Sequence, residues 1–290
     1  MQDEIVARLA NQLQAELVAA EARRAEQAPT PDSMDLYFQG RAWLNKGRTA
    51  DNLARARRYF EQALFTDPGN VDALAWSAYG DALEGVSGFV GNPPAAFAAA
   101  EAKSTKALSL APGHAPALAF LGLVHIWTNR APLGIAECER ALELDRNLAA
   151  AHGFIGFGKI FVARAEETEA HITEALRLSP RDTFAYNQMH AAGLAKLYLG
   201  FYEQAAAWFR RAIEANRNTP IPHFQLGAAL AELGRLRDAR SAVGAGLALY
   251  PAFSIARGRA LWTALSDDPT YLAQCERNLK ALRMAGLPEG

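Results

Sequence analysis

Residues 115–148 read APALAFLGLVHIWTNRAPLGIAECERALELDRNL, and residues 149–182 repeat this pattern without a gap as AAAHGFIGFGKIFVARAEETEAHITEALRLSPRD. Gly122 aligns with Gly156, each preceded by a large apolar residue, and Ala141 aligns with Ala175, 34 residues further on. A large residue followed by glycine, and then a late alanine, indicates two helices that pack closely within each copy. The stretch therefore predicts a fold built from stacked helix pairs.

The 34-residue period and the positions of these small residues resemble the tetratricopeptide repeat (TPR), a helix-turn-helix unit. The resemblance implies an all-α fold, an α-α superhelix in which the first helix of each copy lines the inner surface. More degenerate copies continue the register, so we expect about six repeats. Their predicted bounds are 33–70, 71–114, 115–148, 149–182, 183–219 and 220–253.

The segments that flank residues 33–253 are also predicted to be helical. Residues 1–28 form an amphipathic helix, either a cap of the solenoid or the tail of an upstream domain. Its apolar stripe consists of Ile5, Leu9, Leu13 and Leu17. Residues 254–290 form a C-terminal pair of capping helices, and the aspartates at 267 and 268 are suited to cap the second of them.

Small residues also mark the place where the two helices of a pair cross. Gly122, Gly156 and Gly227 occupy this place on the first helix of three copies. Gly134 and Thr168 occupy the facing place on the second helix, and other copies have alanine there. Small side chains let two helix axes approach to the short end of the usual range of about 8–10 Å. We therefore predict close contact at these crossings.

The composition excludes several classes of function. The chain has 30 basic and 31 acidic residues, which argues against the clustered basic surface that nucleic-acid binding requires. Its two cysteines lie far apart, so a disulfide framework is not expected. The acidic N-terminus does not resemble a signal peptide, and no apolar run approaches the ~20 residues that span a bilayer. We expect a cytoplasmic protein without membrane insertion.

No catalytic or metal-binding pattern is present in the sequence. The six histidines lack the spacing of a metal site, and neither cysteine has a nearby catalytic partner. Residues 153–158, GFIGFG, superficially suggest a phosphate loop, but they lie inside a predicted helix and lack the lysine and the Ser/Thr of a P-loop. We therefore predict a non-enzymatic chain without a cofactor.

The inner-surface positions of the repeats predict a binding groove. Transferred from the family onto this chain, they are apolar and aromatic, and they include Leu123, Ile126, Trp127, Phe157, Ile160, Phe161, Ile221 and Phe224. TPR co-chaperones hold a terminal carboxylate with Lys, Asn and Arg at such positions, and this chain has none of these residues there, so a chaperone-tail clamp is not expected. An apolar groove suits an amphipathic helix or peptide of a protein partner.

Two alternatives to a partner-binding groove stay open at this point. In the first, a flanking segment of the chain itself, either the N-terminal helix or the loop at 83–94, covers part of the groove. In the second, Trp127, Phe157 and Phe161 line a pocket for a small ligand, so that the chain is a ligand sensor.

An insertion of about ten residues is expected in the second repeat, within a Gly/Pro-rich loop at 83–94. The loop carries three apolar residues, Val86, Phe89 and Val90. These residues form a candidate contact surface, or they pack over a neighbouring helix pair.

Four segments resemble one bacterial group more closely. They are DEIVARL at 3–9, MDLYFQGRAWLNKG at 34–47, PTYLAQ at 269–274 and AGLPEG at 285–290. Together they resemble the C-terminal TPR region of rhizobial-type class III adenylate/guanylate cyclases and of related TolB-like/TPR regulators. In those cyclases the catalytic domain lies upstream, and its metal-binding aspartates have no counterpart here. The resemblance implies a non-catalytic scaffold in a larger signalling protein, with an upstream domain as one candidate partner.

Overall fold

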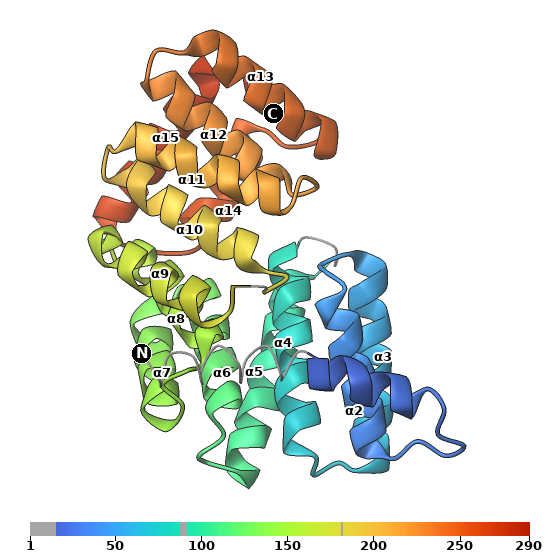
Figure 1. Ribbon diagram of the computed structural model, residues 1–290. Coiled ribbons are helices and arrows are strands. Elements are labelled where there is room, and N and C mark those ends of the chain that lie inside the picture. The colour runs from blue at the N-terminus through green and yellow to red at the C-terminus, as the bar shows by residue number, and fades with distance from the viewer. Residues whose placement is uncertain (1–15, 88–91, 181) are drawn as a thin grey trace. The chain divides into compact units, whose positions relative to one another are not determined.

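The computed structural model describes residues 16–87, 92–180 and 182–290, and every regular element within these ranges is helical (Figure 1). Consecutive helices form hairpins joined by short turns. The prediction of an all-α solenoid built from helix pairs is confirmed. The chain divides into two compact units. Unit 1 comprises Met1–Trp127, Leu133–Ala151 and Arg177–Thr183, and unit 2 comprises Thr128–Pro132, His152–Leu176 and Phe184–Gly290.

Unit 1 contains three helix pairs, in which first helices alternate with second helices. The helices are α2 (Ser33–Asn45), α3 (Ala50–Thr66), α4 (Val71–Ser87), α5 (Pro93–Leu110), α6 (Ala115–Trp127) and α7 (Ala131–Leu144). Each pair buries a stripe of apolar side chains between its helices. The Phe60 ring of α3, for example, is fully buried and packs directly on Gly40 of α2, where an added Cβ would lie 2.6 Å from the ring.

The N-terminal helix is described only from residue 16, and it is helical through residue 25. Ile5, Leu9 and Leu13 lie outside the described residues. Leu17 is 53% exposed, and the buried side chains are those of Val18, Ala22 and Ala25. The predicted stripe is therefore wrong by one residue at this point. Arg24 pairs with Asp35 at the start of α2 at 2.9 Å, and the face that turns toward the protein is the one that carries Val18.

The predicted loop at 83–94 is shorter than expected. Helix α4 continues to Ser87, so the half-buried Val86 belongs to a helix, and α5 begins at Pro93. In the extended part of α4, Gly85 allows close packing of Phe97 of α5, whose ring lies 2.9 Å from where a Cβ on Gly85 would be. Phe89 and Val90 lie outside the described residues.

Unit 2 contains most of α8 and α9 and all of the later helices. They are α8 (Ala149–Phe161), α9 (Thr168–Leu178), α10 (Ala185–Tyr198), α11 (Tyr202–Ala215), α12 (Pro220–Glu232), α13 (Leu236–Leu249), α14 (Ile255–Thr263) and α15 (Pro269–Met284), with the 3₁₀ turn Ala165–Glu167 before α9. The first helices of its three repeat pairs are α8, α10 and α12, and α14 and α15 form the C-terminal hairpin.

The close crossings predicted from the small residues are confirmed in both units. In unit 1, a Cβ on Gly122 would lie 2.6 Å from both the carbonyl oxygen of Gly134 and the sulfur of Cys138. In unit 2, a Cβ on Gly156 would lie 2.7 Å from Ile172, and the Thr168 hydroxyl donates to the Gly156 carbonyl at 3.0 Å. The repeated glycines therefore set the spacing of the helices in each pair.

The turn between the helices of a pair requires one residue in the left-handed backbone region. In unit 2 this residue is Gly200 (φ +81°) after α10 and Gly234 (φ +73°) after α12. After α8 the same place is taken by Ala163, with φ +55°. The turn after Ala163 still closes normally, since the amide of Arg164 donates to the Lys159 carbonyl at 2.8 Å.

Candidate functional site

The C-terminal helix α15 is strongly amphipathic. Its buried stripe comprises Tyr271, Cys275, Leu279 and Leu282, each at most 1% exposed and spaced three or four residues apart. The opposite side carries exposed charged residues, including Glu276, Lys280 and Arg283. A helix with one apolar stripe is stable when that stripe is covered by another part of the protein.

Both ends of α15 are fixed by local signals in the sequence. The Asp268 side chain accepts hydrogen bonds from the amides of Thr270 and Tyr271, as the predicted capping aspartate should. At the other end, Gly286 has φ +88°, and the Leu287 amide donates to the Leu282 carbonyl at 3.0 Å. This is the glycine-based C-cap in which an apolar residue follows the glycine.

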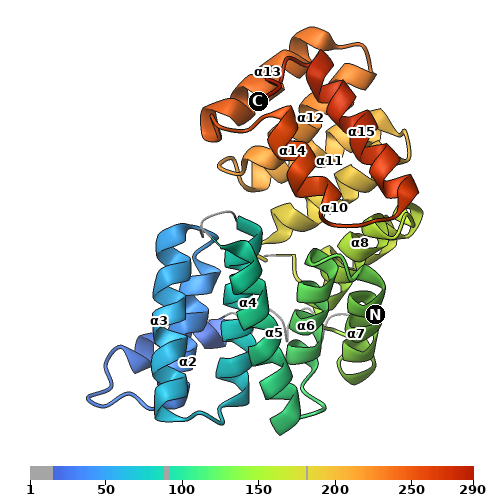
Figure 2. The same cartoon turned by 180° about the vertical axis from the view of Figure 1, so that it is seen from behind.

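Helix α15 runs alongside the first helices of the repeat pairs in unit 2 (Figure 2). Tyr271 and Cys275 of its buried stripe meet these helices, whereas Leu279 packs toward Gly258 of α14. The Tyr271 ring meets Phe161 of α8 edge-on, with centroids 5.5 Å apart, and Tyr198 of α10 at 6.0 Å. Further along, α15 contacts α12. We call the surface of α8, α10 and α12 under α15, which includes Phe161, Tyr198 and Glu232, the first-helix face of unit 2. The sequence predicts a capping helix pair at residues 254–290, and in the structure α15 of this pair covers the first-helix face.

Few polar contacts join α15 to the first-helix face. The Tyr198 hydroxyl lies 3.4 Å from the Cys275 sulfur. Burial raises the pKa of both the Tyr198 hydroxyl and the Cys275 thiol, so both groups stay protonated at neutral pH. The Ser266 hydroxyl, in the turn before α15, donates to the Phe161 carbonyl at 2.6 Å. Aromatic packing around Tyr271 therefore dominates the contact at the start of α15.

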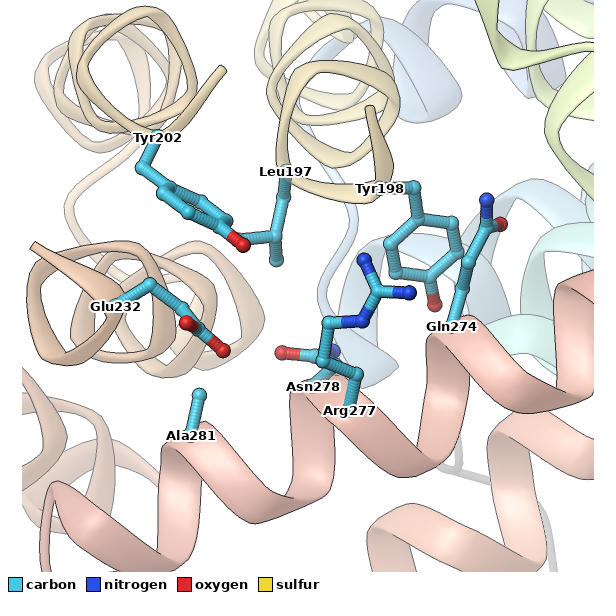
Figure 3. A pocket seen from close by; sticks show the side chains of 8 residues that line it. All are labelled: Leu197, Tyr198, Tyr202, Glu232, Gln274, Arg277, Asn278 and Ala281. Carbon is cyan, nitrogen blue, oxygen red and sulfur yellow. The ribbon is translucent and has the colours of Figure 1, made fainter. Parts of the chain in front are cut away.

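A small cleft remains between α15 and the face. It is lined by Leu197, Tyr198, Tyr202, Glu232, Gln274, Arg277, Asn278 and Ala281 (Figure 3). Asn278 is 3% exposed, and its side-chain amide makes no hydrogen bond of good geometry within the protein, although it lies close enough to the Tyr198 hydroxyl to oppose part of the burial-induced rise in the pKa of that group. The side-chain oxygen of Gln274 is buried without a partner. The packing of α15 is thus incomplete at this cleft.

The hairpin of α14 and α15 is held together by its own bonds. Arg259 of α14 donates two hydrogen bonds of 2.7 Å to Glu276 of α15, which lowers the pKa of the Glu276 carboxyl. The carbonyls of Pro288 and Glu289 accept from the first amides of α14, at 2.8 and 2.9 Å. The last residues of the chain thus close the hairpin on itself.

The predicted groove residues of unit 2 are in different environments. Phe161 lies under Tyr271, and Phe157 is 8% exposed, with its ring 6.3 Å from that of His190. Ile160 is fully buried, and Ile221 is partly exposed. Phe224 does not belong to an open surface: its ring packs on Gly246 of α13 and stacks on Phe253 at 4.4 Å.

The predicted groove residues of unit 1 are mostly interior. Leu123 is 5% exposed, and Ile126 is fully buried. Ile126 faces its own partner helix α7, since its side chain lies 2.8 Å from where a Cβ on Gly134 would be. Trp127 is half-buried at the end of α6.

An aromatic cluster in unit 1 was not predicted from the sequence. The guanidinium of Arg41 on α2 lies 3.3 Å from the centroid of the Trp76 ring on α4. Tyr79 stacks on Phe120 of α6 at 4.7 Å, and Trp76 meets Phe120 edge-on at 5.0 Å. We call the surface of Arg41, Trp76, Tyr79 and Phe120 the first-helix face of unit 1. The spacing of Trp76 and Tyr79, three residues apart on one helix, is the signal that could have indicated it.

Arg41 is buried although it carries a charge. It is 7% exposed, and it donates a 2.6 Å hydrogen bond to the Tyr37 hydroxyl. Burial lowers the pKa of the Arg41 guanidinium. The ring of Trp76 offsets part of the cost of burying this cation, because an aromatic face attracts a positive charge.

Among the described residues, no group of three or more His, Cys, Asp or Glu side chains is arranged to hold a metal ion. His152 and His171 do meet, with their Nδ1 atoms 3.2 Å apart. Burial, followed by the nearby His152, lowers the pKa of His171. In the part of the chain that the structure describes, no helix is both long and apolar enough to span a bilayer.

Comparison with known proteins identifies the fold. Residues 189–219 match the family model described as tetratricopeptide repeat. No curated protein matches the chain. The fold is similar to that of a chain in the APC/C hetero-tetramer Cut9-Hcn1, with a TM-score of 0.67 and 18% identity over 90% of this chain and 48% of that one, so this chain spans about half the length of that relative.

Two smaller structures are also similar. A thermophilic TPR protein of Thermus thermophilus has a TM-score of 0.53 and 16% identity, over 68% of this chain and 98% of that one. A TPR protein from Parabacteroides merdae has a TM-score of 0.53 and 15% identity, over 91% and 99%. At this level of identity the similarities show the fold, which is that of TPR solenoids.

Proposed function

We propose that this chain is a non-catalytic interaction module that binds an amphipathic helix or peptide of a protein partner on the first helices of its repeat pairs. The observation that carries the proposal is α15, an amphipathic helix that lies on the first-helix face of unit 2 through Tyr271, Phe161 and Tyr198. A surface that accommodates a helix of this chain has the shape and the apolar character to accommodate another helix.

The small-ligand alternative has less support. Phe157 and Phe161, two of its three expected pocket residues, are buried against His190 and Tyr271. The cleft beside α15 is lined by other residues, and none of the three belongs to it. We therefore favour a protein or peptide partner.

We further propose that the module belongs to a larger bacterial signalling protein of the cytoplasm, such as a nucleotide cyclase, and that an upstream domain of the same chain is one candidate partner. The proposal is supported by the resemblance of residues 3–9, 34–47, 269–274 and 285–290 to the C-terminal TPR region of such proteins. The reading frame upstream of the codon for Met1 tests it. A cyclase or TolB-like domain in that frame is the expected result, and a stop codon directly upstream would contradict it.

Trp127→Ala tests partner binding at unit 1. Trp127 is half-buried on α6, the helix that also carries Phe120 of the first-helix face. Aromatic residues dominate binding energies at such surfaces, so we expect the substitution to weaken the affinity for a captured partner about tenfold or more. The partner is captured from lysate, purified and titrated against both proteins by calorimetry.

Phe65→Ala is the matched control for this experiment. Phe65 lies near the end of α3, a second helix, and is 91% exposed, so its truncation removes a surface aromatic without touching the first helices. Unchanged affinity for Phe65→Ala beside weaker affinity for Trp127→Ala is the expected result. Equal affinities for Trp127→Ala and the unmodified chain would reject this surface.

A further inference from the structure

We propose that α15 is a displaceable occupant of the first-helix face of unit 2, and that the partner of this face is an amphipathic helix that takes its place. The partner helix presents an aromatic residue and two apolar residues at the spacing of Tyr271, Cys275 and Asn278, the positions of α15 that meet the face. This inference rests on the proposed function, because it identifies the binding surface and the class of partner.

The first step is the complementarity between α15 and the face. Tyr271 packs between Phe161 and Tyr198, and Cys275 lies beside the Tyr198 hydroxyl. These contacts are aromatic or weakly polar, whereas the polar residues Gln274, Arg277 and Asn278 line the cleft beside them. Packing of this kind depends on the pattern of one helix face and not on the rest of the sequence, so another helix with the same pattern can replace α15.

The second step is the imperfect fit of α15 at the cleft. Asn278 buries both atoms of its amide with no hydrogen bond of good geometry beyond a weak interaction with the Tyr198 hydroxyl, and such burial costs free energy. Ala281 leaves space beside Leu197 and the Glu232 carboxylate, toward which it faces in Figure 3. A partner with an apolar residue in place of Asn278 and a lysine in place of Ala281 would remove the poorly hydrogen-bonded amide and place a cation near Glu232.

The third step is that the hairpin of α14 and α15 can separate from the first-helix face of unit 2 while its own two helices stay paired. Its helices are joined to each other by the Arg259–Glu276 pair, and the C-terminal residues cover the start of α14. These bonds stay intact when α15 separates from the face. Because the hairpin lies at the end of the repeats, its departure breaks no bond within a repeat pair.

The two cysteines of the chain provide a built-in test of this opening. Cys275 and Cys138 are both fully buried, but Cys275 lies on the buried side of α15 and Cys138 lies in the crossing of α6 and α7. The full-length chain is treated with iodoacetamide under native conditions, and alkylation of each cysteine is followed by peptide mass spectrometry. If α15 opens locally, Cys275 reacts at least about tenfold faster than Cys138, whose exposure requires unfolding of its helix pair.

A probe peptide tests displacement directly. The probe is residues 268–287 with Asn278→Leu and Ala281→Lys, and with alanine at 275 so that it does not consume the reagent. We expect it to accelerate alkylation of Cys275 in the full chain and to leave Cys138 unchanged, whereas a peptide of the same composition in scrambled order has no effect. In the chain itself, Asn278→Leu should slow alkylation of Cys275 about tenfold by holding α15 more tightly.

Two outcomes overturn the inference. Equal alkylation rates for the two cysteines would mean that α15 leaves only when the protein unfolds. Failure of the probe peptide to accelerate alkylation of Cys275 would mean that another helix does not compete for the face. Neither outcome affects binding at Trp127, so the proposed function and this inference can fail separately.

Discussion

The first-helix faces of the two units are covered in different ways. In unit 1, the guanidinium of Arg41 lies over the Trp76 ring, and Arg41 comes from the neighbouring first helix α2. In unit 2, Phe161 and Tyr198 are covered by Tyr271, which comes from a helix after the last repeat. The same repeat thus produces an aromatic face twice. Only the cover in unit 2 can leave while all repeat pairs stay folded, because α2 is itself part of a pair.

The energetic character of the two covers also differs. Arg41 is a buried cation whose pKa is lowered by burial and whose contact with Trp76 is electrostatic as well as apolar. Tyr271 contributes two aromatic contacts, each worth about 0.5–1.5 kcal/mol beyond the area it buries. The cover of the unit 1 face is therefore part of the repeat structure and stays in place. The face of unit 2 becomes accessible when α15 leaves it.

Tyr271→Ala should have the largest effect on this difference. Loss of a fully buried aromatic side chain costs about 3–5 kcal/mol, and here the cost falls on the contact that holds α15. We expect the amides of α15 to lose protection in hydrogen exchange while those of α2–α6 keep theirs. Lys280→Ala, on the exposed side of the same helix, is the control. Retained protection of α15 in Tyr271→Ala would show that other contacts hold the helix.

Substitutions at the two crossing glycines should have the next largest effect. In unit 1 a Cβ on Gly122 would meet the backbone oxygen of Gly134, which cannot move without shifting α7. In unit 2 a Cβ on Gly156 would meet the end of the Ile172 side chain at 2.7 Å, while the nearest backbone atom, the Thr168 carbonyl oxygen, lies at an ordinary contact distance of 3.6 Å. We expect Gly122→Ala to lower the free energy of unfolding by about 2–3 kcal/mol and Gly156→Ala by about 1 kcal/mol or less. Urea unfolding measures both, and equal losses would contradict the argument.

The fold was predictable because its signals are local. The 34-residue period, the glycines at 122, 156 and 227 and the aspartate that caps α15 each act within a helix pair or a helix end. Such positions constrain the backbone wherever the pair is placed. The N-terminal stripe was wrong at Leu17 because Leu17 and Val18 are both apolar, and the side that becomes buried depends on docking against α2.

The site was less predictable because it depends on what each side chain meets. Ile126 and Phe224 turn toward their own partner helices, where glycines at 134 and 246 leave space for a large side chain. A prediction that treats all copies of the repeat as equal misses this difference. The contact of Tyr271 with Phe161 joins residues far apart in the sequence. The apolar spacing of α15 was visible in the sequence, but the surface that it covers was not.

Ala163→Gly should have the smallest effect, and it should stabilise the protein. In the first pair of unit 1 the turn residue is Gly47, with φ +106°, whereas in the first pair of unit 2 it is Ala163, with φ +55°. The left-handed region costs a residue with a Cβ about 1 kcal/mol or more, and glycine avoids this cost but gains entropy in the unfolded chain. We therefore expect a net gain of at most about 1 kcal/mol in the free energy of unfolding, measured by urea denaturation. Gly200→Ala, at the equivalent turn after α10, should lose a similar amount, so a change of the same sign in both variants would contradict the role of this turn.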